Sequence, residues 1–282
     1  MKSRLKFYFR AFDSASIPLP ASACVEPVEF FSAGEDEEAS VDSEGEIALM
    51  NWLAAQPDFL AVLLAQVGLS GKIVFDTNVV KPFFRSNEVG EVDLVAIPEG
   101  APKSAVAFQV KRFPVRRDGE RERVVLNPAK RAKLISQCND TAALGFHRVY
   151  GVVLIVTDGR NHPAVSALHR GASEQTFIQL YRFTRDVSLN SRVGLAFLEI
   201  VQPTARDWTA FGMVAAGIDE QADPIEQAGE FSEKVEKWAR GATAKGRCAS
   251  MEFDCSPTTG VPVSAHEQVK AVLNPKHPHI DS

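Results

Sequence analysis

The sequence predicts an α/β domain with a small mixed β-sheet flanked by helices. Between residues 44 and 157 the predicted elements follow the order αβββαβ. The strand-like runs are rich in β-branched and aromatic residues, as expected for a sheet. Apolar residues make up 45% of the 282 residues and charged residues 24%, which is the composition of a globular protein large enough for one or two domains.

The first elements are a strand and an interrupted helix. Apolar and polar residues nearly alternate over residues 4–12, which predicts a strand, and the acidic run 34–38 predicts an exposed linker. Ser43 and Glu46 have the spacing of a capping box, which would open a helix. Pro57 interrupts or restarts that helix. Its apolar face is expected to contain Ile47, Met50, Leu53 and Ala54.

The central elements are three strands, a helix and a buried strand. The strands are expected at residues 72–85, 91–97 and 104–113, with a turn at 98–100. After a basic loop, Pro128 begins a helix that Gly145 ends. The run 150–157 is almost wholly apolar, which predicts a central strand covered on both faces.

The C-terminal third is less regular. Strands are expected at residues 176–183 and 192–201, and an amphipathic helix at 225–240. The chain from residue 241 onward is expected to be loosely ordered. The predicted organisation is an N-terminal strand and linker (1–43), a core (44–201), and a C-terminal helix and tail (202–282).

Charge is distributed unevenly along the chain. The net charge is -5, yet nine cations and only three acids lie between Lys111 and Lys133. Such a patch can face phosphate groups. A solvated loop of mixed charge explains the pattern equally well.

Composition also bears on the cellular compartment. No apolar run reaches the roughly 18 residues of a membrane span, and Arg10 and Asp13 interrupt the segment that could resemble a signal peptide. The four cysteines lack metal-binding spacing and are expected to be reduced thiols. The sequence therefore predicts a cytoplasmic protein with no membrane partner.

A single acidic residue, Asp93, lies inside an apolar predicted strand, where burying an unpaired carboxylate is energetically unfavourable. The next strand places Gln109 and Lys111 on one face because strand side chains alternate. Adjacent strands lie about 4.8 Å apart, so the three side chains can converge.

A magnesium ion explains this set of residue types. Mg²⁺ prefers oxygen ligands and needs few carboxylates besides substrate phosphate. Asp93, the Gln109 amide oxygen and the Val110 carbonyl could bind it, and Mn²⁺ could substitute. Lys111 would then orient the attacking water and stabilise negative charge in the transition state.

These motifs resemble the PD-(D/E)XK nuclease superfamily. The matching segments are G-E-V-D-L-V-A and F-Q-V-K-R-F, and glutamine in place of the second acid resembles the Mrr-type restriction endonucleases. The resemblance covers residues 44–183 and implies a restriction-endonuclease-like core. It assigns catalytic positions to Asp93, Gln109 and Lys111, with Glu46 as the acid of the first helix. The capping box explains Glu46 equally well.

The resemblance also implies a function and partners. It implies a metal-dependent DNA endonuclease, with a role in restriction or defence against foreign DNA. Cutting both strands would favour a homodimer, and a partner protein could supply specificity. Candidate DNA contacts are Arg112, Arg116, Arg117, Lys130 and Gln137.

Two alternatives remain open. The chain could be a non-cleaving DNA-binding or scaffolding protein that retains the fold. Alternatively, Asp93 is a core acid paired with Lys111, in which case Gln109 should point away from it. Gln137 could contact a substrate phosphate or Lys111, but a glutamine on a helix is more often merely exposed.

Overall fold

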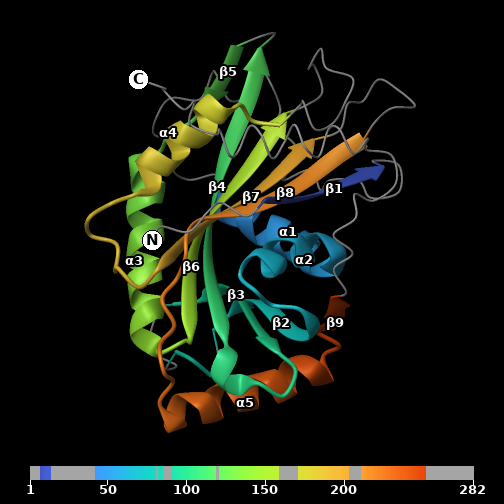
Figure 1. The fold of residues 1–282 in the computed structure, drawn as a ribbon, viewed down its shortest axis with the longest axis vertical. Coiled ribbons are helices and arrows are strands. Elements are labelled where there is room, and N and C mark those ends of the chain that lie inside the picture. Colours follow the sequence, from blue (N-terminus) through green and yellow to red (C-terminus); the bar gives the residue numbers. More distant parts are fainter. Residues whose placement is uncertain are drawn as a thin grey trace, which may run out of the picture.

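The computed structural model describes residues 7–13, 42–80, 82–84, 90–118, 121–158, 171–202 and 211–251. Within them, one curled, mixed sheet of nine strands is flanked by helices (Figure 1). The strands are β1 (Phe7–Asp13), β2 (Gly71–Val79), β3 (Val92–Pro98), β4 (Val106–Asp118), β5 (Arg121–Val124), β6 (Arg148–Asp158), β7 (Gly194–Gln202), β8 (Phe211–Glu220) and β9 (Cys248–Met251). The helices are α1 (Asp42–Ala55), α2 (Pro57–Gln66), α3 (Pro128–Leu144), α4 (Glu174–Thr184) and α5 (Gly229–Ala244), with a 3-10 turn at Pro102–Ser104.

The strand order is β1-β8-β7-β6-β4-β3-β2-β9, and β5 pairs with β4. Strands β4, β6 and β7 run parallel, and the other neighbours are antiparallel. The sheet crosses both predicted domain boundaries, because β1 pairs with β8 and β9 pairs with β2. The residues before 44 and after 201 therefore contribute strands to the same sheet as the predicted core.

Helices cover both faces of the sheet. The even-numbered core residues of β4 pack with α1 and α2, as Phe108 and Val110 illustrate. The opposite face packs against α3 and α5 around Ala107, and against α4 around Phe113. No single described helix is long and apolar enough to cross a membrane, and α1 and α2 pass that test only as a pair bent by 98°.

Several predicted elements are confirmed. The predicted elements occur in the predicted order, with β5 added between β4 and α3. Helix α3 begins at Pro128, and Gly145 ends it with a left-handed φ of 99°. Strand β6 lies between two parallel neighbours and is buried on both faces, as expected. Pro57 begins a second helix, α2.

Other expectations were wrong. Residues 176–183 form part of helix α4, not a strand. The basic segment forms the hairpin β4–β5, not a loop, and it projects past the neighbouring strands (Figure 1). Strands β8 and β9 were not predicted, and β9 contradicts the loose order expected at 248–251. Residues 252–282 lie outside the described part of the chain.

Two helices differ in detail from the prediction. Helix α5 begins at Gly229, four residues later than expected. In α1, Met50, Leu53 and Ala54 are buried as expected, but Ile47 is 40% exposed and Leu49 takes its place in the core.

Candidate functional site

The candidate site lies where β3 separates from β4. Their pairing runs from Ala96↔Val106 to Leu94↔Phe108, and β4 then continues beside β6 until it meets β5 at Val115. A buried backbone N–H that loses its strand partner needs another acceptor. Val110 N–H donates to Asp93 Oδ2 at 2.6 Å, so a carboxylate replaces the strand at this fork.

Glu46 of α1 contacts β4 just beyond Val110, at Lys111 and Arg112. Its Oε1 accepts a hydrogen bond from Arg112 N at 3.1 Å, and its Oε2 accepts one from Lys111 Nζ at 3.3 Å. The carboxylate therefore binds β4, which the capping-box interpretation did not predict. Ser43, the other capping-box residue, has a side chain outside the described part of the structure.

Lys111 is the cation at the centre of the fork. Its side chain is buried, with 3% exposed, and its Nζ donates to the Val110 carbonyl at 2.7 Å. The same Nζ lies 3.7 Å from Asp93 Oδ2. One buried ammonium group thus contacts oxygens from three residues, two of them carboxylates.

The environment of Asp93 opposes its ionisation. Burial is the largest cause and raises the pKa of this carboxyl, Lys111 and the Val110 N–H lower it, and Glu46 and Glu91 raise it; the net pKa is about 6. A carboxyl with a pKa this close to neutrality is typical of functional sites, although structural networks also produce such shifts.

This pKa predicts how stability depends on pH. The folded-state pKa, about 6, exceeds the ordinary value of 3.8, so the folded protein binds a proton that the unfolded chain releases between these pH values. Stability should therefore fall as pH rises through this window, by about 3 kcal/mol at most. Asp93→Asn removes this dependence.

We expect the unfolding free energy of the wild type, minus that of Asp93→Asn, to decrease between pH 4 and pH 7 in urea titrations containing a chelator. The subtraction cancels the titration of the other groups. A difference that stays constant across this range would contradict the pKa shift.

Gln109 is buried, with 1% exposed, and lies opposite Asp93 when the register is continued. Its Nε2 donates to the Glu91 carbonyl at 2.9 Å and to Thr141 Oγ1 at 2.8 Å. Because a carbonyl can only accept, the nitrogen must face Glu91 and the amide orientation is fixed. Gln109 Oε1 is left without a hydrogen-bond partner.

A hard cation fits this set of oxygens. An unpartnered buried acceptor is unfavourable, and Gln109 Oε1 is one at the fork. With a carboxylate oxygen of Asp93 and the Val110 carbonyl, it would supply the all-oxygen donor set that Mg²⁺ prefers. Among the described residues, no group of three or more His, Cys, Asp or Glu gathers as a metal site. The candidate set therefore depends on neutral oxygens.

The sequence did not reveal Thr141, which α3 places against Gln109. Its side chain is 1% exposed and lies seven residues after buried Leu134, on the face of α3 that packs on the sheet. Helical spacing marks this face, but not which polar residue on it meets Gln109.

The candidate DNA contacts differ in position. Arg112 is 7% exposed, so a phosphate would have to reach it within the fork. Lys130 Nζ donates to the Arg112 carbonyl at 3.4 Å. Gln137 Oε1 is buried without a partner, and no hydrogen bond joins Gln137 to Lys111 in the part of the chain described. In the hairpin, Arg116 and Arg117 lie opposite Arg123 and Glu122, but their side chains are outside the described structure.

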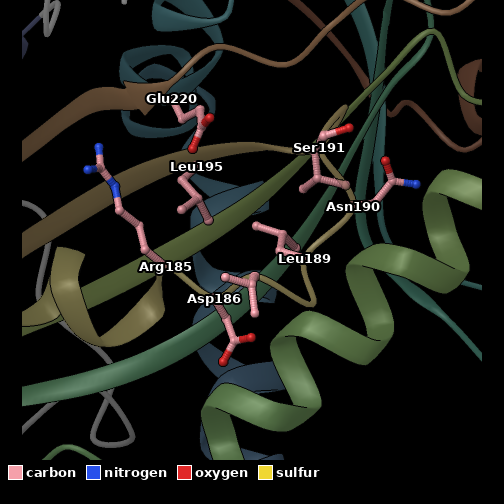
Figure 2. A pocket seen from close by; sticks show the side chains of 9 residues that line it. Arg185, Asp186, Leu189, Asn190, Ser191, Leu195 and Glu220 are labelled. Carbon is pink, nitrogen blue, oxygen red and sulfur yellow. The ribbon is translucent and has the colours of Figure 1, made fainter.

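A separate hollow lies beside β7 and β8 (Figure 2). Leu195 and Glu220 line it, and Arg185 at its rim makes two hydrogen bonds to Asp219, at 2.8 and 3.0 Å. Strands β6 and β4 separate it from Asp93 in the sheet. It is therefore not part of the fork.

Comparison with models of known protein families found no match, and comparison with curated proteins found no similar chain.

Proposed function

We propose that this chain is a metal-dependent nuclease with a PD-(D/E)XK-like core that hydrolyses phosphodiester bonds in DNA. The observation that carries the proposal is the convergence of Glu46, Asp93 and Lys111 at the fork. Gln109, whose Oε1 has no hydrogen-bond partner, lies opposite Asp93 when the strand register is continued. The order of α1, β2, β3, β4, α3 and β6 around the fork supports the same core.

Each residue has a chemical role in this proposal. Asp93, Gln109 Oε1 and the Val110 carbonyl would hold the cation. Mg²⁺ bound there would neutralise phosphate charge and lower the pKa of a coordinated water. Lys111 would orient the attacking water and stabilise the negative charge that develops on the phosphate. Glu46 would hold the Lys111 ammonium in place through its 3.3 Å contact.

The hairpin supports DNA as the substrate. Strand β4 carries Lys111 and continues directly into the β4–β5 hairpin, where the register places Arg116 opposite Arg123. The same hairpin lies within the segment 111–133, which contains nine cations and three acids. A polyanion bound against it would neutralise this local excess of positive charge.

The paired-core-acid alternative explains only part of the fork. It accounts for the 3.7 Å approach of Lys111 to Asp93 and for the bond to Val110 N–H. It also expects Gln109 to turn away from Asp93, and the Gln109 Nε2 donates to the Glu91 carbonyl and to Thr141. It gives no reason why the buried Gln109 Oε1 has no donor.

The test is cleavage of plasmid and linear DNA with Mg²⁺ or Mn²⁺, and with chelator. We expect wild-type cleavage that requires metal and is lost in Asp93→Asn and Lys111→Met. The matched control is Lys234→Met on α5, an exposed lysine that should retain activity. Cleavage that survives both site substitutions would refute this site. DNA binding without cleavage by any variant would support the non-cleaving alternative.

A further inference from the structure

Asn78, at the end of β2, has an unusual backbone conformation. Among the described residues it is the only non-glycine with a positive φ, +53°. Asparagine tolerates this left-handed region better than most residues, yet the conformation is uncommon inside a strand. Such outliers gather at functional sites, where the surroundings hold them in place.

The position of Asn78 relates it to the fork. The β2–β3 register pairs Thr77 with Leu94 and Val79 with Val92, so Asn78 lies opposite Asp93. The unusual backbone is therefore one strand away from the central acid of the proposed site.

The left-handed backbone changes where neighbouring side chains point. In a regular strand, successive side chains face opposite sides. Here Thr77 Oγ1 and Asn78 Nδ2 both donate to Asn51 Oδ1 of α1, each at 3.3 Å. Val79 then packs on the other face with Val92. The conformation of Asn78 thus allows two consecutive residues, Thr77 and Asn78, to hydrogen-bond the same residue of α1.

Helix α1 is therefore attached on both sides of Asp93. Asn51 attaches it to β2, and five residues earlier Glu46 attaches it to Lys111 and to Arg112 N on β4. Strand β3, which carries Asp93, lies between β2 and β4. Any shift of α1 at Asn51 would move Glu46 relative to the fork.

We propose that Asn78 is a positioning residue that, through Asn51, fixes α1 so that Glu46 contacts Lys111 and Arg112 N. The catalytic meaning of this role rests on the proposed nuclease function. The positioning itself can be measured without cleavage, because Glu46 is the acceptor for the Arg112 N–H.

The decisive variant is Asn78→Gly, since glycine adopts a positive φ without strain and only the side-chain bond is lost. We expect hydrogen exchange at the Arg112 amide, measured by NMR, to rise about tenfold because its acceptor becomes mobile. Exchange at Val152, inside the β6 ladder, should not change. The melting temperature should stay close to that of the wild type. Asn51→Ala loses the Thr77 bond as well and should raise the exchange at least as much, whereas Asn190→Gly, in an exposed turn, should not raise it.

Kinetics supply the second readout. Asn78→Gly should lower kcat for DNA cleavage by about tenfold with KM unchanged, and should cause no further loss in a Glu46→Gln background, because the two residues act as one unit. An unchanged Arg112 exchange rate, or losses that multiply fully in the double variant, would overturn the proposal. If the wild type cleaves no DNA, the nuclease function fails, and the exchange measurement alone decides the role of Asn78.

Discussion

Replacing Lys111 by methionine is expected to tighten Mg²⁺ binding by about tenfold or more while lowering DNA cleavage about 100- to 1,000-fold. The two effects have opposite signs because Lys111 would assist catalysis but would also compete with Mg²⁺ for the carboxylates of Asp93 and Glu46. It is the proposed catalytic cation, and it also neutralises Asp93 and Glu46, which lie 3.7 and 3.3 Å from its Nζ.

The physical reason is that the Lys111 ammonium compensates the charge of two carboxylates, Asp93 and Glu46, at a buried position. Removing one partner of a buried ion pair leaves the other charge uncompensated, which is strongly destabilising. In Lys111→Met, the carboxylates of Asp93 and Glu46 would face each other without the ammonium. A divalent cation would then relieve more repulsion than it does in the wild type, where it must share the Val110 carbonyl with Lys111 Nζ.

Two measurements check this result. Calorimetric titration with Mg²⁺ gives the dissociation constants of the wild type and of Lys111→Met. Thermal melts should show that the variant is less stable than the wild type in chelator and gains more from Mg²⁺. Lys234→Met should behave as the wild type in both. If Lys111→Met binds Mg²⁺ more weakly than the wild type, Lys111 helps to hold the cation and does not compete with it.

Local sequence patterns predicted some helices and strands correctly and others incorrectly. Helix α3 has proline at its first position and glycine after its last, so its bounds could be read from the sequence. Residues 176–183 look strand-like by composition. Their buried members, Thr176, Phe177 and Leu180, have helical spacing, and Ser173 caps the start by accepting from Thr176 N. Here period and capping prevail over β-propensity.

Long-range pairing explains the missed strands. Strand β8 contains alanine and glycine at positions such as Ala215, Ala216 and Gly217, which carry little β-propensity. It is placed between β7 and β1, and β1 comes from the other end of the chain. Contacts that distant leave no local pattern.

The residues of the candidate site also fall into those that local sequence patterns predicted and those that they missed. Strand alternation and the turn after β3 predicted that Gln109 and Lys111 both approach Asp93. Lys111 Nζ lies 3.7 Å from Asp93, whereas the Gln109 amide nitrogen contacts Glu91 and Thr141. Glu46 resembled a capping residue because its actual partners, Lys111 and Arg112, are 65 and 66 residues away. Thr141 and Asn78 were missed for the same reason, since their roles depend on how α3 and α1 lie on the sheet.

Gly194→Ala is expected to destabilise the protein by about 2–4 kcal/mol. A Cβ at this position would lie 2.5 Å from Tyr150 Cε1 and 2.6 Å from the Ala222 backbone nitrogen. Neither neighbour can move easily. The Tyr150 ring is fully buried and stacked on Phe108 at 5.8 Å, and its hydroxyl accepts a hydrogen bond from Gln221.

The control is Gly241→Ala in α5, where an added Cβ meets nothing within 4 Å. Because alanine favours a helix more than glycine does, this variant should gain about 0.5–1 kcal/mol. Urea unfolding of both variants measures the two changes, which should have opposite signs. Equal stabilities would mean that Tyr150 can rearrange. Since Phe108 forms the last β3–β4 pair before the fork, Gly194→Ala should also weaken exchange protection of the Val110 amide, whereas Gly241→Ala should leave it unchanged.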